Sequence, residues 1–504
     1  MGNIFLPPPG SAKNGQRLAS SDMIGQAQRF KKSRSMKKTA LFRSAMLIPL
    51  GLAAASIIAL VAWLGPWPAK RLQLRTPGTD RAPGMDAADK LNPVLNGRLV
   101  PGDGKAADLP GAWTGFRGTH RDGKSREPVS LARSWQNGGP RELWAVDVGE
   151  GYAGAAVLKG RVYLMDYDQP KKQDALRCLS LADGKEIWRF AYRNTVKRNH
   201  GMSRSVPALT EQFVVAMGPK GHVVCVDAVT GELRWGLDLV KEYETTVPPW
   251  YAGQCPLIDD GKVFLAPAGK DALLIAVDLQ TGKEAWRTPN PNGWKMTHSS
   301  IMPLEFGGER MLIYCANQGV VGVSAKDGRL LWETRAWKIS LATVPSPLVL
   351  EDGRIFLSGG YNAGSMMLKL RKEGEKFGAQ SLFRLPPEVF GATQHTPLLH
   401  EGFLYGVRPD GKFVCLNLEG KPVWVSEAGQ DFGLGSFILA DGIIYAMNDS
   451  GMLRMIEARP EKYHLLGQAQ VLKGRESWGP PAIAGGRLLV RDLTRLICLE
   501  VGKH

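Results

Sequence analysis

Short apolar runs separated by glycine-containing turns make up most of the chain from about residue 142 onward. One unit reads CLSLADGKEIWRF at residues 178–190, and the next reads CVDAVTGELRWGL at residues 225–237. In each unit, a short apolar strand leads into an Asp-Gly or Thr-Gly turn, and a second strand carries a tryptophan. Glycine in such turns supplies the backbone conformations that tight hairpins need. The pattern predicts many short antiparallel strands and few helices.

This unit recurs eight times along the chain. The strand position held by Cys178 in the first unit has equivalents spaced 40–51 residues apart, at Cys225, Ala276, Gly322, Leu368, Cys415, Met455 and Cys498. Such a period, with four short strands in each unit, is typical of a propeller blade. One four-stranded sheet cannot bury both of its faces alone, so the units must stack. We therefore predict an all-β, eight-bladed β-propeller over residues 112–504, with an array of β-sandwiches as the alternative.

The two ends of the repeat region complete each other. Residues 141–149, RELWAVDVG, resemble a fourth strand with nothing before it, and residues 477–501 supply three strands with nothing after them. Pairing these two segments would close the ring and hide the sheet edges. Each repeat tryptophan should pack between neighbouring blades, where it buries on the order of 200 Å². The repeat tryptophans are Trp144, Trp188, Trp235, Trp286, Trp332 and Trp424.

The amino-terminal part has a different character. Residues 44–69 contain no charged residue, and this run is long enough for a helix to cross a bilayer core of about 30 Å. Residues 1–43 hold nine lysines and arginines against one acid, which favours a cytoplasmic location for this tail. We predict a signal-anchor transmembrane helix over 44–66, a Pro/Gly-rich linker over 67–111, and a propeller on the periplasmic side of an inner membrane. A cleaved signal peptide is the alternative.

Charge and cysteine usage narrow the class of function. The chain has a formal net charge of +16, but half of this excess lies in the amino-terminal tail, so we expect no nucleic-acid partner. The six cysteines include no C-x-x-C pair. Four of them hold the same strand position on separate blades, where they should be too far apart for disulfides. We therefore expect free, buried thiols.

The turn-and-tryptophan unit resembles the PQQ-like repeat of the quinoprotein dehydrogenase-like superfamily, and within it the BamB-like propellers. Residues 113–124, WTGFRGTHRDGK, are similar to a short signature that precedes such propellers. The resemblance implies one of two activities. Quinoprotein dehydrogenases hold pyrroloquinoline quinone (PQQ) and a calcium ion at the propeller centre, with an aspartate base and often an adjacent cysteine pair. BamB proteins are lipoproteins that scaffold outer-membrane assembly.

The chain departs from both patterns. It has no adjacent cysteine pair and no acidic cluster suited to calcium, and we interpret the D-x-D motif of Asp166 and Asp168 as part of a charged loop. It also lacks a nucleophile motif such as G-x-S-x-G. We therefore assign no catalytic residue and no metal ligand. An apolar anchor stands where BamB lipoproteins have a lipidated start.

The segments before the innermost strands should converge at one mouth of the central channel. Aromatic rings, an arginine and histidines around one axis could hold a planar or anionic ligand, with PQQ as the candidate cofactor. In the alternative, these residues only cap the channel and bond one another. The predicted ligand-binding residues are Tyr152, Arg204, Trp250, Tyr251, Gln254, His298, Gln394, His395 and Trp478.

These observations favour a membrane-anchored, non-enzymatic binding or scaffold protein. Its expected partners are envelope proteins, in envelope or outer-membrane protein assembly. A PQQ-dependent dehydrogenase with an atypical site is the alternative function. A sensor, in which ligand capture signals through the anchor, is a third hypothesis.

Overall fold

The computed structural model describes residues 51–63, 91–135 and 138–503 of the chain. The chain divides into two compact units, Met1–Asp86 and Ala87–His504.

In the first unit, residues 51–63 form an α-helix. Among the described residues, no helix is both long enough and apolar enough to cross a membrane. The predicted membrane span 44–66 is described only in its central part. The rest of that span, the basic tail 1–43 and residues 67–90 of the predicted linker lie outside the described ranges.

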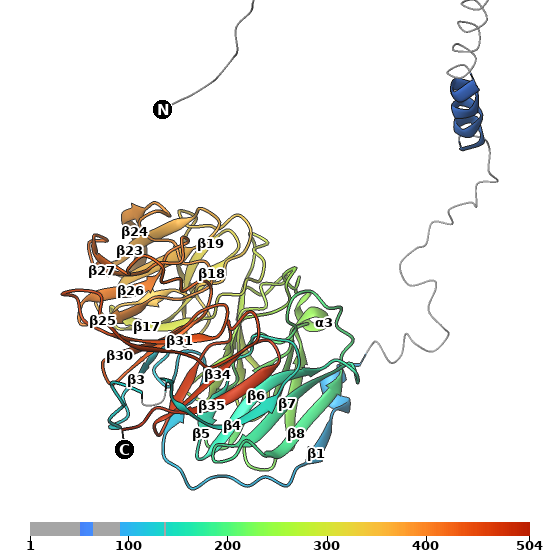
Figure 1. Cartoon of the computed structure of the whole chain (residues 1–504). Helices are drawn as coiled ribbons and strands as arrows, with labels where there is room; N and C mark the ends of the chain where they lie inside the picture. The colour runs from blue at the N-terminus through green and yellow to red at the C-terminus, as the bar shows by residue number, and fades with distance from the viewer. Residues whose placement is uncertain (1–50, 64–90, 136–137, 504) are drawn as a thin grey trace, which may run out of the picture. The chain divides into compact units, whose positions relative to one another are not determined.

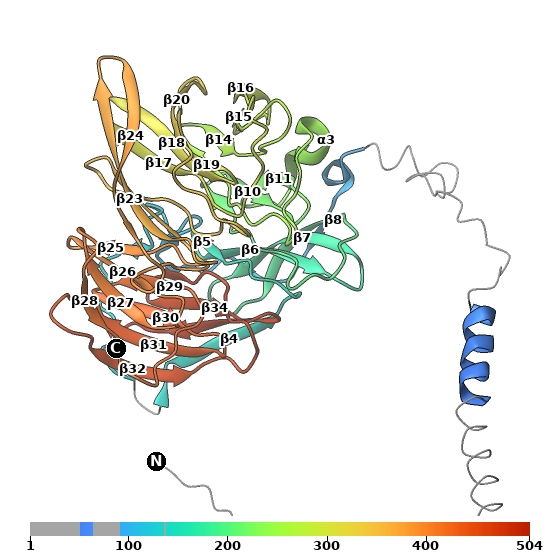
Figure 2. The same ribbon diagram turned by 90° about the horizontal axis from the view of Figure 1, so that it is seen from above.

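The second unit is a ring of eight β-sheets (Figures 1 and 2). Each sheet has four antiparallel strands that follow one another in hydrogen-bonded order, and three additional short strands lie at the margins of two of the sheets. We number these blades along the chain, beginning with the sheet that contains Cys178. In every blade the first strand lies nearest the central axis.

Blades 1 to 4 follow one another along the chain. Their strands are β5 (Ala156–Leu158), β6 (Arg161–Asp168), β7 (Gln173–Ser180) and β8 (Glu186–Arg193); β9 (Ala208–Leu209), β10 (Phe213–Met217), β11 (His222–Asp227) and β12 (Leu233–Asp238); β13 (Leu257–Asp259), β14 (Lys262–Leu265), β15 (Leu274–Asp278) and β16 (Glu284–Thr288); and β17 (Met302–Phe306), β18 (Glu309–Ala316), β19 (Gly319–Ser324) and β20 (Leu330–Thr334). A short helix, α3 (Leu239–Tyr243), follows β12, where the Asp238 side chain accepts the N–H of Lys241 as a cap.

Blades 5 to 8 complete the ring. Their strands are β21 (Leu348–Val349), β22 (Arg354–Gly359), β23 (Gly364–Glu373) and β24 (Lys376–Leu385); β25 (Leu398–His400), β26 (Phe403–Val407), β27 (Phe413–Asn417) and β28 (Pro422–Val425); β29 (Phe437–Ala440), β30 (Ile443–Met447), β31 (Met452–Glu457) and β32 (Leu465–Gln470); and β33 (Ala482–Ala484), β34 (Arg487–Arg491), β35 (Arg495–Glu500) and β4 (Arg141–Asp147).

The eighth blade joins the two ends of the domain. Strand β4, which precedes blade 1 in the chain, pairs antiparallel with β35, and Trp144 lies opposite Cys498. The prediction that residues 141–149 close the ring against 477–501 agrees with this register. The prediction of an all-β, eight-bladed propeller is confirmed.

All eight blades share one irregularity between the third and fourth strands. In blade 1, Cys178 pairs with Trp188, and the register shifts by a β-bulge directly after this pair. A shift follows the equivalent pair in each of the other seven blades. In blade 5 this pair contains Met367, one residue before the Leu368 that the repeat spacing predicts. The partner is a tryptophan in six blades, Phe383 in blade 5 and Gly467 in blade 7. A bulge increases the local twist of a strand, and its eightfold recurrence marks the repeat in three dimensions.

Four of the interfaces between blades are built around a tryptophan and a turn glycine of the next blade. Trp235 of blade 2 packs on Gly282 in the β15–β16 turn of blade 3, where a Cβ atom would lie 2.7 Å from the indole ring. The indole N–H donates to the carbonyl of Leu279 in the same turn region, at 2.8 Å. Equivalent hydrogen bonds to the next blade come from Trp144, Trp188, Trp286 and Trp424. Equivalent glycine contacts are made by Gly184, Gly231 and Gly328.

Part of the predicted linker packs on the propeller. A 3₁₀ helix, η1 (Pro93–Asn96), is followed by β1 (Arg98–Pro101), which pairs with the outer strand β8 of blade 1. Val94 is fully buried, and Gly236 of blade 2 leaves the space that its side chain fills. The chain therefore contacts the propeller before residue 111. Its strand β1 pairs with the outer edge of β8, and the Val94 side chain fills the space beside Gly236.

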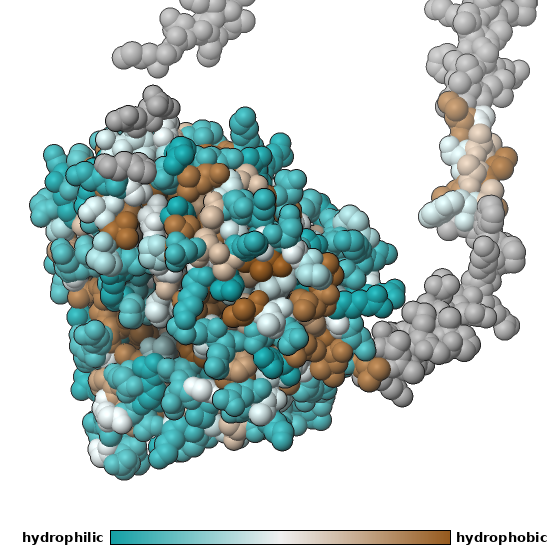
Figure 3. All heavy atoms as spheres, turned by 90° about the horizontal axis from the view of Figure 1, so that it is seen from below, coloured by the Kyte–Doolittle hydropathy of each residue, from teal (hydrophilic) through white to brown (hydrophobic). Residues whose placement is uncertain are grey.

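The surface and the interior of the propeller differ as expected for a water-exposed domain. Hydrophilic residues cover most of the face drawn in Figure 3, with hydrophobic residues showing in patches between them. All six cysteines are buried and free, which confirms the prediction of buried thiols.

Replacing the turn glycine at a blade interface should destabilise the protein more than replacing a turn glycine elsewhere. Gly282 and Gly261 both lie in blade 3 with φ of 70° and 68°, but nothing lies within 4 Å of a Cβ at Gly261. Both alanine variants strain the backbone by about 1–2 kcal/mol. Gly282→Ala should lose about 1–3 kcal/mol more, because its methyl group meets Trp235. Urea unfolding followed by tryptophan fluorescence measures the difference, and equal losses would contradict the interface described here.

Candidate functional site

A pocket of about 280 Å³ opens at one mouth of the central channel. The segments that precede the innermost strands of all blades except blade 7 line it, so its walls are held by the ring itself. Its lining residues are Phe116, Tyr152, His200, Arg204, Trp250, Gly253, Cys255, His298, Ser300, Ala342, Val344, Tyr361, Gln394, Trp478 and Pro480.

Two stacked rings form one wall. Tyr152 and Trp478 lie with ring centres 5.1 Å apart and planes 26° from parallel. Carboxylates fix both rings from behind. The Tyr152 hydroxyl donates to Glu476, and the Trp478 indole N–H donates to Asp449 at 2.7 Å. Burial raises the pKa of Tyr152, so its hydroxyl stays a donor at neutral pH.

Arg204 brings a positive charge to this wall. Its guanidinium carbon lies 4.8 Å from the centre of the Tyr152 ring, in a cation–π contact. Its Nε and Nη2 atoms are buried and have no hydrogen-bond partner among the described residues. Burial lowers the pKa of Arg204, but an arginine keeps its charge in proteins. None of the lining residues is a carboxylate, so the lining itself does not neutralise this charge.

His298 lies in the same lining, next to Gly253. Burial, reinforced by the charge of Arg204, lowers the pKa of His298 to about 4. The imidazole is therefore neutral at physiological pH and can donate or accept a hydrogen bond.

The signature segment, residues 113–124, closes the channel and contributes Phe116 to the lining. It begins in β2 (Ala112–Trp113), which pairs with β5 of blade 1, and it ends in β3 (Lys124–Ser125), which runs parallel to β29 of blade 7. Two buried arginines fix it to further blades. Arg117 donates to the carbonyls of Thr396 and Pro397, each at 2.8 Å. Arg121 reaches the carbonyls of Pro256 and Ile301, at 3.2 and 3.3 Å.

A run of hydrogen bonds links blades 2 to 6 and includes the lining residues Cys255 and Ser300; we call it the inner girdle. The N–H of Val206 donates to the Cys255 sulfur at 3.2 Å, and the N–H of Cys255 donates to Ser300 Oγ at 3.0 Å. The N–H of Ser300 then donates to Ser346 Oγ, and that of Ser346 to Thr396 Oγ1, each at 2.9 Å. Because burial raises the pKa of Cys255, its thiol serves as an acceptor here and is not activated as a nucleophile.

The structure brings six of the nine predicted ligand-binding residues together at this pocket. They are Tyr152, Arg204, Trp250, His298, Gln394 and Trp478.

The other three predicted residues do not line it. Gln254 is fully buried and bonds both backbone groups of Ala266, at 2.8 and 3.2 Å. The Tyr251 hydroxyl donates to the carbonyl of Lys197. His395 is buried with its ring centre 5.5 Å from that of Phe437. Each of the three adjoins a residue that does line the pocket. Tyr251 has a φ of 70°, so it follows a turn and not an extended segment.

Three larger lining residues are not among those predicted from the sequence. Phe116 belongs to the signature segment, for which no place in the channel was predicted. His200 lies four residues before Arg204, and Tyr361 lies in the β22–β23 loop, away from the segments we considered. No repeat pattern marks Tyr361, whose φ of 56° places it in the left-handed region.

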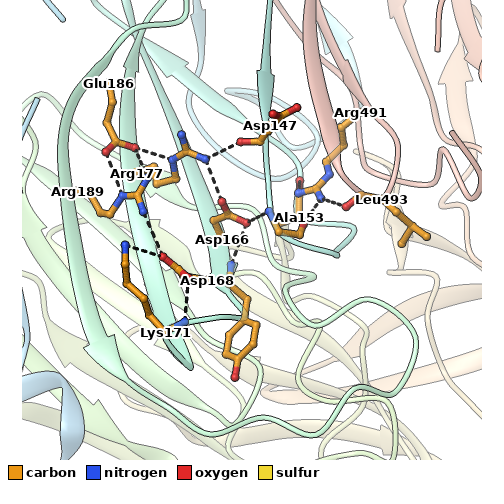
Figure 4. Close-up of polar contacts among 12 residues, drawn as sticks. Asp147, Ala153, Asp166, Asp168, Lys171, Arg177, Glu186, Arg189, Arg491 and Leu493 are labelled. Carbon is orange, nitrogen blue, oxygen red and sulfur yellow. Dashed lines mark hydrogen bonds and ion pairs between the residues drawn. The ribbon is translucent and has the colours of Figure 1, made fainter. Parts of the chain in front are cut away.

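The D-x-D motif forms part of an ion-pair network in blade 1 (Figure 4). Asp166 and Asp168 lie at the end of strand β6, not in the loop that we expected. Asp166 accepts the N–H of Gly149 at 2.8 Å and pairs with Arg177 at 3.0 Å. Asp168 pairs with Lys171 at 3.1 Å. Both carboxylates are thus already bonded to basic side chains and backbone N–H groups of the protein.

The residues present do not fit a metal-assisted quinone. The stacked wall suits a flat ring, and Arg204 suits a carboxylate. However, calcium needs several oxygen ligands, usually with carboxylates among them, and the pocket lining contains no carboxylate. In the described part of the chain, no three His, Cys, Asp or Glu residues are grouped so that they could hold a metal ion.

A family model described as outer membrane protein assembly factor BamB matches residues 171–426, just over half of the chain. The chain belongs to this BamB family. No curated protein matches its sequence. The matched part of this BamB-family chain runs from the strand β7 to the end of blade 6.

Solved structures share the fold of this BamB-family chain at low identity. BamB from Moraxella catarrhalis is 12% identical with a TM-score of 0.51, and the match covers 71% of this chain and 99% of that chain. A europium-containing methanol dehydrogenase is 13% identical with a TM-score of 0.55, covering 76% and 89%. The computationally designed Ika8 protein is 12% identical with a TM-score of 0.50, covering 72% and 100%. Since a BamB protein, a dehydrogenase and a designed protein share this fold, function must be argued from the site.

Acidification should destabilise the propeller through its buried neutral histidines. Burial lowers the pKa of His395 to about 4, from 6.5 in the unfolded chain, which corresponds to about 3 kcal/mol. This stability is present above pH 6.5 and is lost as the pH falls toward 4, because the unfolded chain binds the proton first. His395→Asn should therefore lose less stability than the wild type between pH 6.5 and 4.5. Melting temperatures across this window test the difference, and parallel profiles would contradict it.

Proposed function

We propose that this protein is a membrane-anchored binding and scaffold propeller without catalytic activity of its own. In this proposal the propeller lies on the periplasmic side of an inner membrane and assists envelope or outer-membrane protein assembly. The observation that carries the proposal is the chemistry of the central pocket. Its lining combines aromatic rings with one permanent cation and contains no carboxylate, which suits binding better than acid–base or metal chemistry.

Ser300 and Cys255 of the lining are poor candidates for nucleophiles. The Ser300 hydroxyl accepts a backbone N–H in the inner girdle, and no general base is bonded to it in the described residues. The pKa of the Cys255 thiol is raised by burial. A nucleophile needs an adjacent base or a lowered pKa, and neither residue has one.

The rim of the ring supports a role in protein contacts. Blade 1 has its outer edge covered by β1, whereas the fourth strands of the other blades end their sheets, among the strands that the structure describes. Such an edge can pair with a strand from a partner. On β28 of blade 6, Val423 and Val425 are 43% and 38% exposed, so this edge also offers apolar side chains.

The amino-terminal segment supports the membrane location. Residues 44–69 carry no charge, nine basic residues precede them, and residues 51–63 are helical.

The full chain should stay with membranes after an alkaline carbonate wash and be released by detergent. In spheroplasts, external protease should degrade the propeller. A chain beginning at residue 91 is the control and should be soluble. Release of the full chain by carbonate would contradict the anchor.

A blocked strand edge should reduce partner capture. Lysine on an edge strand opposes pairing with another chain, so Val423→Lys with Val425→Lys should lower cross-linking to envelope partners about tenfold, equivalent to about 1.4 kcal/mol. Val229→Lys, at a turn residue that is 51% exposed, is the matched control. Quantitative mass spectrometry of cross-linked membranes measures both variants. Equal capture by the double variant and the control would contradict a docking role for this edge.

A further inference from the structure

The guanidinium of Arg204 presents one unused edge. Nε and Nη2 lie on the same side of an arginine side chain, and together they form the fork that receives a carboxylate through two parallel hydrogen bonds. Both atoms are buried without a partner among the described residues. A buried donor left unpaired is costly, so an arginine held in this way is prepared for an acceptor from outside the chain.

The surroundings of Arg204 leave its charge available. Glu476 accepts the Tyr152 hydroxyl, and no ion pair between Glu476 and Arg204 is formed. His298 beside it is neutral, because burial holds its pKa at about 4. The lining therefore presents a positive charge and contains no carboxylate, while Glu476 acts on Arg204 from behind Tyr152. Partial burial strengthens the attraction of such a site for an anion.

The remaining walls define the shape of the ligand. The stacked pair of Tyr152 and Trp478 provides a flat surface, and Trp250, Tyr361 and Phe116 add aromatic area to the same lining. The volume of about 280 Å³ lies just below the usual range for ligand pockets, which is about 300–1,000 Å³. It therefore suits a compact ring system and not a long chain.

We propose that the pocket binds a small, flat carboxylate without a metal ion. The carboxylate binds the Nε–Nη2 edge of Arg204, which turns toward the pocket because both atoms are otherwise buried, and the ring lies against the aromatic wall. This inference rests on the proposed function only in treating the pocket as a binding site, and it adds the chemical class of the ligand.

Indole-3-acetate and indole-3-acetamide test the inference, since they share a shape and differ in charge. Each is titrated into the full chain in detergent micelles by isothermal titration calorimetry. The acid should bind with saturation, and the amide should bind about tenfold to a hundredfold more weakly, the range expected when charge-assisted hydrogen bonds are lost. Equal binding of the two, or no binding of either to the folded protein, would overturn the proposal.

Arg204→Lys separates the fork from the charge. It keeps the cation but cannot make two parallel hydrogen bonds, so affinity for the acid should fall about tenfold or more. Arg198→Lys is the matched control, because Arg198 is exposed and pairs with Glu150 at 2.6 Å. Melting temperatures confirm that each variant is folded. Wild-type affinity in folded Arg204→Lys would also overturn the proposal.

The third test compares the affinity of the full chain for PQQ with and without calcium. Calcium should not strengthen PQQ binding, because the lining holds no carboxylate. If calcium tightens PQQ binding about tenfold, which is about 1.4 kcal/mol, the site is metal-assisted and the inference is wrong. The scaffold proposal fails independently of this one. It fails if the Val423→Lys, Val425→Lys variant cross-links to envelope partners as well as the wild type does, while the protein still binds the carboxylate.

Discussion

The propeller depends on the packing of one blade's tryptophan against the turn glycine of the next blade. The contact needs a residue without a side chain at a left-handed backbone conformation, as at Gly282 with φ of 70°, and an indole lying directly on it. Both partners belong to one repeat unit, so repetition of the unit creates the same contact at four interfaces. There Trp144, Trp188, Trp235 and Trp286 lie on Gly184, Gly231, Gly282 and Gly328. In blade 5, where the tryptophan is missing, Phe383 takes its place and packs on Gly420.

The inner girdle reinforces this arrangement from the centre. Like the indole N–H groups, its backbone donors point from each blade to the following one, as from Val206 to Cys255 and from Cys255 to Ser300. Cys255 and Ser300 of the girdle also line the pocket, so its walls are fixed by the ring and by the signature segment. A site whose walls are already in place loses little conformational entropy on binding, which favours recognition of a rigid ligand.

The repeat spacing, the ring closure and the buried thiols could be predicted because each depends on a pattern written locally in the sequence. The packing of β1 on β8 could not, since Arg98–Pro101 has no repeat partner. Within the site, the sequence identified the converging segments but not which of two adjacent side chains lines the pocket. Gln254 was predicted to do so, but Cys255 lines the pocket and Gln254 bonds the backbone of Ala266. The sequence could not show that Nε and Nη2 of Arg204 lack a hydrogen-bond partner. That depends on which groups distant segments of the chain place near them.

The seam between β4 and β35 has a consequence for biosynthesis. Glu142 and Arg495, which pair across the seam at 3.0 Å, are 353 residues apart. At about 5–20 residues per second, roughly 20–70 s pass on the ribosome between the first half of the seam and the second. During that time β4 is an unpaired strand exposed to misassembly. A nascent chain that stops before β35 is therefore an open ring, and the synthesis of β35 decides whether all eight blades are held together.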